Sequence, residues 1–192
     1  MPDVRTLHQR ACEDFLATAA GVRPEQWQDP TPCEGWTVRD LVGHLAYENR
    51  WTPLLLAGMT MEEVGDRFEG DLLGDDPVGA LSDAVEAALA AVAQPGVLER
   101  TVHLSFGDAP AEEYLWQLFA DHLIHRWDLA RATGQDERVD PELLAPLVRW
   151  FAEREQLYRA AGVIGPRAAV PDDADEQDRL LAAFGRDPRP PG

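Results

Sequence analysis

The 192-residue sequence has little cysteine and no long run of apolar residues. Its two cysteines, Cys12 and Cys33, show no CxxC spacing, which argues against a disulfide framework or a cysteine-rich zinc site and suits a reducing compartment. Neither the first residues nor any later stretch supplies the uninterrupted apolar segment that a signal peptide or a membrane span needs. We therefore predict a cytoplasmic protein.

Basic residues are also scarce, with 17 Lys and Arg against 35 Asp and Glu, for a formal net charge of -18. Such an acidic surface repels phosphate backbones and anionic lipids, which disfavours a nucleic-acid or membrane partner. Hydrophobic residues make up 45% of the chain, enough to build the core of one domain of this length. We expect a small-molecule substrate as partner, and a homodimer is compatible with the sequence.

Apolar residues recur at spacings of three and four over residues 4–20, 38–56, 77–92, 110–133 and 141–162, which predicts amphipathic helices. Thr37 and Asp40 form a capping box before the second helix, and Gly134 supplies a left-handed end for the fourth. Residues 57–74 are predicted as a loop with one short helical turn. Residues 97–110 alternate in polarity and predict a short extended piece.

The predicted fold class is all-α, a four-helix bundle with long connections, because long amphipathic helices dominate and strand signals are few. Residues 163–192 hold one short helical pattern, near 176–184, between two Pro-rich flanks. We expect residues 1–162 to form a metal-binding helical bundle. Residues 163–192 are expected to form a docked C-terminal helix and tail packed on that bundle.

Three side chains on two of the predicted helices could share one cation. His44 lies on the core side of helix 38–56. Asp121 and His125 are four residues apart on helix 110–133, so their side chains stack on one face. Catalytic zinc commonly takes three ligands from His and Asp or Glu and keeps a position open for water or substrate. The sequence therefore predicts His44, Asp121 and His125 as metal ligands, in a site that could activate a carbonyl, a water or a thiol.

Two further residues near these ligands leave alternatives open. His122 lies close to the centre of the same apolar stripe, so a ligand set of His44, His122 and His125 is also geometrically possible. Otherwise His122 is a packing residue that hydrogen-bonds to a neighbouring helix. Glu48, one turn after His44, is predicted to act as a catalytic base or to support a ligand.

Other polar residues are interpreted without a role in the site. Asp128, Arg126 and Arg131 could form a network that supports the ligands or a solvated ion-pair face, and the second interpretation is favoured. Cys33 could be a nucleophile, but it has no histidine near it in sequence, which favours a structural or incidental role. His8 and His103 have no acidic or imidazole companion at a useful spacing.

Two long motifs carry a family resemblance. TPCEGWTVRDLVGHL (31–45) and DHLIHRWDLARATGQ (121–135) resemble the DinB-like superfamily, in particular the mycothiol-dependent maleylpyruvate isomerase family of actinobacteria. The segment GPRAAVPDDADEQDRLLAAFGRDP (165–188) is similar to the C-terminal signature of one subgroup. The resemblance implies a DinB-type bundle that holds zinc or nickel through His44, Asp121 and His125, with aspartate where the isomerase itself has a glutamate pattern.

The resemblance also implies an activity. In that family the metal activates the thiol of mycothiol, a low-molecular-weight cofactor, for isomerisation or S-transfer. The leading hypothesis is therefore a metal-dependent thiol S-transferase or isomerase that acts on a small electrophile. The alternatives are a thiol-independent metal-dependent hydrolase or lyase, and a non-catalytic metal- or ligand-binding bundle.

Overall fold

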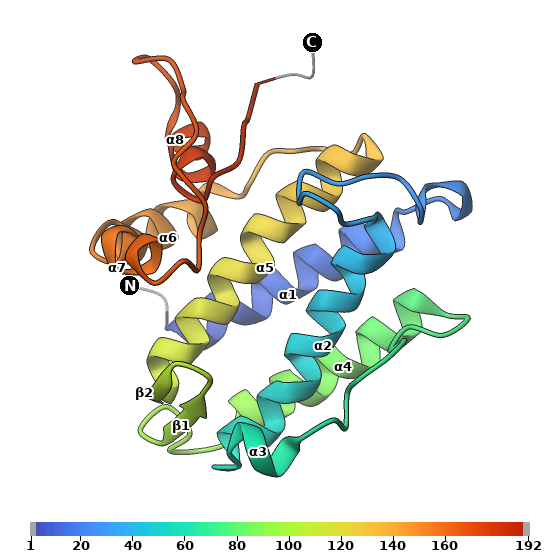
Figure 1. Ribbon diagram of the computed structural model, residues 1–192, viewed down its shortest axis with the longest axis vertical. Coiled ribbons are helices and arrows are strands. Elements are labelled where there is room, and N and C mark those ends of the chain that lie inside the picture. The colour runs from blue at the N-terminus through green and yellow to red at the C-terminus, as the bar shows by residue number, and fades with distance from the viewer. Residues whose placement is uncertain (1–2, 190–192) are drawn as a thin grey trace. The chain divides into compact units, whose positions relative to one another are not determined.

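The computed structural model describes residues 3–189 of the chain (Figure 1). Its elements follow in chain order: α1 (Val4–Ala20), the 3-10 helix η1 (Pro24–Gln26), α2 (Val38–Leu56), α3 (Met61–Val64), α4 (Pro77–Val92), β1 (Thr101–Leu104), β2 (Gly107–Pro110), α5 (Ala111–Thr133), α6 (Pro141–Ala152), α7 (Glu155–Ala160) and α8 (Glu176–Ala183). Contacts divide the chain into two compact units, one ending at Glu137 and one beginning at Arg138. The predicted helical class is confirmed.

The first unit is a bundle of the four long helices α1, α2, α4 and α5 (Figure 1). Helix α2 packs on α4 and α1 packs on α5, while contacts of α1 with α4 and of α2 with α5 complete the ring. Its interior is apolar and includes Phe15, Leu41, Leu45, Leu81 and Leu129, all fully buried. Burial of these faces on folding is the main force that holds the helices together.

Helix α2, which carries His44, begins as its sequence predicts. The Thr37 side chain accepts a hydrogen bond from the Asp40 backbone N–H, and the Asp40 carboxylate accepts one from the Thr37 backbone N–H at 2.9 Å. Helix α5 ends at Gly134, whose φ of 69° is the left-handed conformation that glycine adopts at no steric cost. Both capping predictions are confirmed, and they fix the ends of the two helices that bear the candidate ligands.

The connection between α4 and α5 is more ordered than a single extended piece. Strands β1 and β2 form an antiparallel hairpin, in which Thr101 pairs with Pro110 and Leu104 with Gly107. Val102 and Ala109 are buried against the end of the bundle, so the alternation of polarity follows the two faces of the hairpin. The short helical turn expected within 57–74 is α3.

The second unit contains α6, α7 and α8. The single helix predicted over 141–162 is wrong, because the chain turns at Glu153 and Arg154 and continues as α7. Tertiary contacts outweigh helix propensity here. Phe151 at the end of α6 stacks on Phe184 with ring centroids 3.9 Å apart, while Glu155 pairs with Arg167 at 2.7 Å.

The predicted division of the chain at residue 162 falls inside the second unit, since α6 and α7 gather with the C-terminal segment. Within this unit the Gln177 side chain of α8 accepts a hydrogen bond from the Val139 backbone N–H. The docking of residues 163–192 on the bundle stays a prediction, and residues 190–192 lie outside the described part. Between residues 3 and 189, none of the helices combines the length and the apolar character needed to cross a bilayer.

Candidate metal centre

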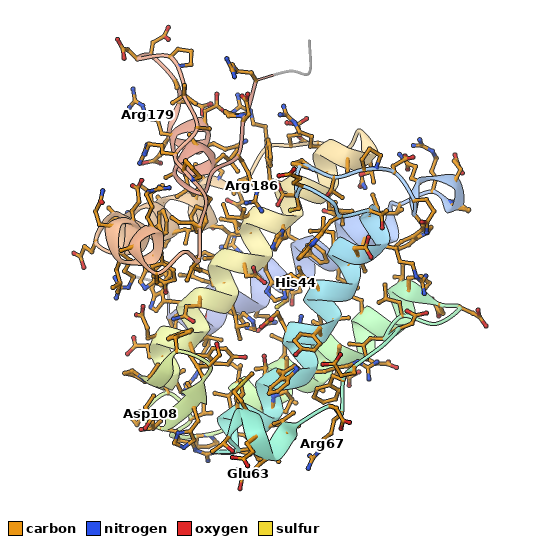
Figure 2. The ribbon with its side chains drawn as sticks, in the orientation of Figure 1. His44, Glu63, Arg67, Asp108, Arg179 and Arg186 are labelled. Atoms are coloured by element: carbon orange, nitrogen blue, oxygen red, sulfur yellow. The ribbon has the colours of Figure 1, made fainter. Side chains whose placement is uncertain are left out.

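The structure brings the three predicted ligands together between α2 and α5. His44 Nε2 lies 3.2 Å from Asp121 Oδ2, and His125 Nε2 lies 3.2 Å from Asp121 Oδ1. One donor atom from each residue falls within 4.8 Å of the other two. Figure 2 shows His44 near the middle of α2, on the side that faces α5. Asp121 and His125, one turn apart on α5, thus lie beside His44, which precedes Asp121 by 77 residues.

The cluster opens toward solvent on one side. The side chains of His44 and Asp121 keep 27% and 29% of their surface exposed, and that of His125 keeps 10%. The indole of Trp36, from the loop before α2, covers the two histidines, with ring centroids 5.0 Å from His44 and 5.9 Å from His125. A small molecule could therefore reach the cluster beside Trp36.

The buried carboxylate of Asp128 orients His125 through Nδ1, the ring nitrogen that does not face Asp121. His125 Nδ1 lies 3.0 Å from Asp128 Oδ2, and Asp128 is fully buried. Metal-ligating histidines usually donate their other ring N–H to such a carboxylate, which fixes the ring and leaves Nε2 for the metal. The favoured interpretation of Asp128 as part of a solvated ion-pair face is therefore wrong, and the alternative, a residue that supports a ligand, is the one that the structure agrees with. Its i, i+3 spacing to His125 is the signal that could have revealed this role.

Cys33 joins the same group from the loop before α2. Its Sγ lies 3.3 Å from Asp128 Oδ2 and 3.8 Å from His125 Nδ1. The neighbours of Cys33 in sequence could not reveal this contact, because Cys33 and His125 are 92 residues apart. Arg126 and Arg131 form ion pairs with Asp14 and Glu137, with only 11% and 17% of their side chains exposed.

Opposite charges gather in the centre. Burial raises the pKa of Asp121, but His125 and His44 outweigh it and hold that pKa well below its usual value. Burial lowers the pKa of His125, but the negative charge of Asp121 first, and then hydrogen bonds of the imidazolium with Asp121, Asp128 and Cys33, raise it well above its usual value. The centre thus holds a carboxylate and an imidazolium, and a divalent cation bound here would displace the His125 proton.

Glu48 stands one turn after His44 on α2. Burial, and then the negative charge of Asp121, raise the pKa of Glu48 to about 7. A carboxyl group whose pKa lies near neutrality can both accept and donate a proton under physiological conditions. This is the behaviour that a catalytic role for Glu48 requires.

His122, the alternative ligand, uses both ring nitrogens in hydrogen bonds outside the candidate centre. Its Nδ1 lies 2.8 Å from the Leu118 carbonyl oxygen, so it donates there, and its Nε2 accepts from Asn49 Nδ2 at 2.9 Å. Burial lowers the pKa of His122 to about 4. The geometry favours Asp121 over His122 as the third residue beside His44 and His125.

His8 and Cys12 complete a second, buried group with His122. His8 Nε2 lies 3.4 Å from Cys12 Sγ, and the His8 and His122 rings meet edge to face at 5.3 Å. His8 therefore has two companions: Cys12 lies one turn later on α1, and His122 comes from α5. His103 also has one, because its Nδ1 lies 2.7 Å from Asp108 Oδ1 across the hairpin. Strand pairing and helix packing created both contacts.

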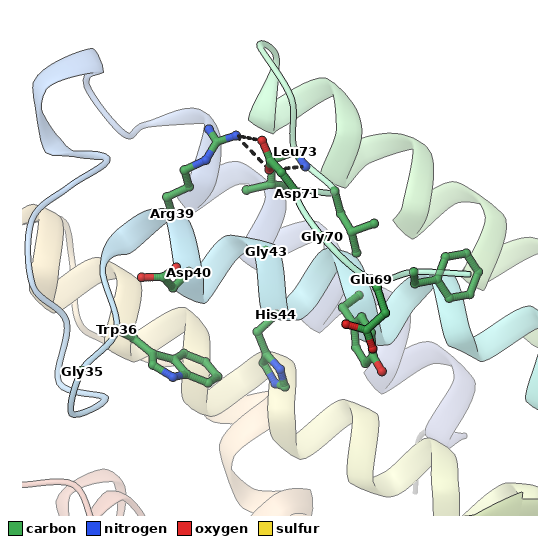
Figure 3. A pocket seen from close by; sticks show the side chains of 13 residues that line it. Gly35, Trp36, Arg39, Asp40, Gly43, His44, Glu69, Gly70, Asp71 and Leu73 are labelled. Atoms are coloured by element: carbon green, nitrogen blue, oxygen red, sulfur yellow. Dashed lines mark hydrogen bonds and ion pairs between the residues drawn. The ribbon is translucent and has the colours of Figure 1, made fainter. Parts of the chain in front are cut away.

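A groove of about 640 Å³ adjoins the candidate centre (Figure 3). Its floor is the exposed side of α2 between Arg39 and Tyr47, and its wall is the segment Phe68–Leu73 that leads toward α4. His44 lines the groove as well as the centre, and Trp36 stands beside it. Volumes of 300 to 1,000 Å³ are typical of small-molecule sites.

The donor set fits a divalent metal. Two imidazole Nε2 atoms and one carboxylate are a set common to zinc, nickel and iron sites. The orientation of His125 by buried Asp128 is the support that metal ligands usually have. Exposure of the cluster on one side leaves room for an additional ligand.

Comparison with known proteins identifies the family. The model of the mycothiol maleylpyruvate isomerase N-terminal domain matches residues 8–130. The uncharacterized protein Rv0738 of Mycobacterium tuberculosis is 34% identical over 199 residues, which cover 96% of this chain and 98% of the relative. A second relative from that organism, the uncharacterized protein Rv0036c, is 31% identical over 86 residues, covering 45% of this chain and 32% of the relative.

Solved structures agree on the fold. A crystal structure of the mycothiol-dependent maleylpyruvate isomerase superposes with a TM-score of 0.65 at 20% identity, covering 87% of this chain and 75% of that chain. A histidine-to-alanine mutant of the isomerase gives 0.67 at 19% identity, with the same coverage. The chain therefore belongs to the DinB-like family of the mycothiol maleylpyruvate isomerase N-terminal domain.

Proposed function

We propose that this protein is a metal-dependent enzyme of the mycothiol-dependent isomerase or S-transferase type, acting on a small electrophile. In this proposal His44, Asp121 and His125 hold one divalent ion, zinc or nickel. The observation that carries it is the convergence of their donor atoms within 4.8 Å, at a site open to solvent on one side. Membership of a family named for a mycothiol-dependent enzyme supports the choice of thiol.

A divalent cation bound here would lower the pKa of a thiol and so favour the nucleophilic thiolate. The side chains would balance the charge and orient the ligands. Asp121 balances charge between the two imidazoles, because each of its oxygens faces one of them. Asp128 holds His125 in the tautomer that leaves Nε2 free for ligation.

Glu48 would handle the proton in this scheme. Its carboxylate, one turn after His44 on α2, would take the thiol proton and later return one to the product. Trp36 would limit water access, since its indole covers both histidines. Shielding of this kind strengthens the electrostatic interactions within the site.

Metal content is the first test. The protein should be purified without a histidine tag, and its metal measured by elemental analysis beside the variants His44→Ala and His125→Ala. We expect about one equivalent in the parent protein and a loss of at least tenfold in affinity in both variants, because a three-ligand site keeps only two. His103→Ala, which changes a histidine of the hairpin far from the centre in sequence, is the control and should keep full metal.

Thiol dependence is the second test. The metal-loaded protein should be assayed with and without mycothiol on small conjugated oxo acids with a cis double bond, including maleylpyruvate, by ultraviolet absorbance. We expect turnover with the thiol and none without it. In the elemental analysis described above, full metal stoichiometry in His44→Ala would refute the ligand assignment. Turnover independent of any thiol would indicate a hydrolase or lyase instead.

A further inference from the structure

Three buried side chains with metal-binding atoms meet where α1 packs on α5 (Figure 1). His8 and Cys12 are one turn apart on α1, and His122 comes from α5. His8 Nε2 lies 3.4 Å from Cys12 Sγ, and one donor atom from each of the three residues lies within 4.8 Å of the other two. All three side chains are fully buried. This buried group shares no residue with the candidate centre between α2 and α5.

Hydrogen bonding within the buried group is incomplete. His8 Nε2 faces the Cys12 thiol, but among residues 3–189 no side chain or backbone group forms a hydrogen bond with His8 Nδ1, which is also buried. A buried polar atom without a partner is destabilising and is rare in folded proteins. An ion that binds one nitrogen of His8 while the ring reorients would remove this defect.

The second imidazole is already held as a ligand would be. His122 Nδ1 donates to the Leu118 carbonyl oxygen at 2.8 Å, which leaves Nε2 with a lone pair. Metal-ligating histidines commonly have such a backbone carbonyl on their other nitrogen. An ion at Nε2 would replace the hydrogen bond that Asn49 Nδ2 donates to it at 2.9 Å. Asn49 would keep the bond from Nδ2 to the Leu45 carbonyl oxygen at 2.7 Å.

The donors and their surroundings favour a soft monovalent cation. Thiolate ligands select Cu(I), whereas zinc in structural sites usually takes four ligands. Cys12 would bind as a thiolate and release its proton to solvent, so a monovalent ion with two neutral imidazoles forms an uncharged complex. A divalent ion would leave a net positive charge in the interior, which is strongly unfavourable. The carboxylate of Asp121 does not offset that charge, because it is already paired with the two histidines of the candidate centre.

We propose that His8, Cys12 and His122 bind one soft monovalent cation, of which Cu(I) is the type, in a closed structural site. Catalytic metal sites keep a position open to substrate, whereas this group is sealed from solvent. The ion would link the first and last long helices of the bundle. Because the three donors meet only when α1 and α5 are packed, binding would stabilise the folded chain. The inference does not depend on the proposed function.

The test uses Cu(I) itself as the probe. The metal-free full chain carrying Cys33→Ser, which removes the other thiol, would be titrated without oxygen in competition with a chromophoric Cu(I) chelator. We expect one bound equivalent. X-ray absorption at the copper edge should show sulfur together with imidazole nitrogen around the ion, and the urea midpoint of unfolding should rise when Cu(I) is present.

Variants in the same Cys33→Ser chain assign the ligands. Cys12→Ala should weaken Cu(I) binding by at least about 100-fold and His8→Gln by at least about tenfold, because loss of a residue that only supports a ligand already costs about 10- to 100-fold. His44→Gln, the control matched to His8→Gln, removes a histidine of the candidate centre and should leave the affinity within about threefold. Circular dichroism would verify that each variant folds.

Several outcomes would overturn the inference. These are no Cu(I) binding by Cys33→Ser, a bound ion with only nitrogen and oxygen neighbours, or unchanged affinity in folded Cys12→Ala. Loss of Cu(I) in His44→Gln would place the ion at the candidate centre instead. Displacement of Cu(I) by an equal amount of zinc would contradict the charge argument. If Cys12→Ala does not fold, the X-ray absorption spectrum of Cys33→Ser decides, because Cys12 is then the remaining thiol in the chain.

Discussion

Replacement of Asp128 by asparagine probes the electrostatic support of the centre with almost no change in shape. The carboxylate is fully buried and lies 3.0 Å from His125 Nδ1. The substitution removes a negative charge behind the imidazole, and it allows the amide NH₂ to face the ring N–H instead of accepting from it. Loss of such a partner typically lowers metal affinity by about 10- to 100-fold.

We place Asp128→Asn toward the upper end of that range, which corresponds to about 2.5 kcal/mol, because burial keeps the lost interaction unscreened. Affinity for zinc would be measured by competition with a chromophoric chelator at pH 7.5. Cys33→Ala, which leaves the bond between Asp128 and His125 in place, should change affinity by less than about threefold. Asp83→Asn, at an exposed position of α4, is the control.

The reasoning would be refuted if Asp128→Asn folded normally and bound zinc within twofold of the parent protein. Such a result would mean that the orientation of His125 is set by packing alone, for example by the stacked Trp36 indole. Because Asp128 is buried, the free energy of unfolding must be measured in the same samples. A variant that fails to fold would be replaced by Asp128→Glu, which keeps the charge but shifts the carboxylate.

Three further predictions concern stability of the metal-free protein, measured by urea unfolding. The pKa of buried His122 is about 4, below that of an unfolded histidine, so this residue should contribute a loss of about 2 kcal/mol between pH 7 and pH 5, which the difference between His122→Gln and the parent protein isolates from the opposite contribution of Glu48. The pKa of Glu48 is raised to about 7, so its ionisation should cost up to about 3 kcal/mol as pH rises from about 4.5 to 7, and Glu48→Gln should remove that loss. Thr37→Ala removes the side-chain cap of α2 and should cost about 1 kcal/mol at any pH between 5 and 8, with no change in the pH slope. Parallel pH curves for either titrating variant and the parent protein would contradict the assigned pKa.

Helix positions were predictable because their causes are local. The 3.6-residue period, the box of Thr37 with Asp40 and the glycine at 134 act within a few residues, and the structure follows each of them. The failure at Glu153 has the opposite cause. Helix propensity continued through 141–162, but the stacking of Phe151 on Phe184 joins residues far apart in sequence and favours a turn.

Two of the three candidate ligands were accessible from spacing alone, since Asp121 and His125 share one helical face. His44 was placed on the core side of its helix by the same periodicity. No local pattern could connect Cys33 to Asp128, or His8 to His122, because these contacts exist only once the helices have packed. The groove likewise needed the ion pair of Arg39 with Asp71, which brings a loop onto α2.

The sequence by itself determined the helical elements, most of their ends and the family to which they belong. It also determined which residues had the chemistry to bind a metal. Only the tertiary structure decided which of them meet, that Cys33 lies beside Asp128, and that His122 pairs with Asn49 and not with the candidate ligands. The physical reason is range: capping and periodicity act over a single turn, whereas burial and charge pairing depend on neighbours that the fold alone supplies.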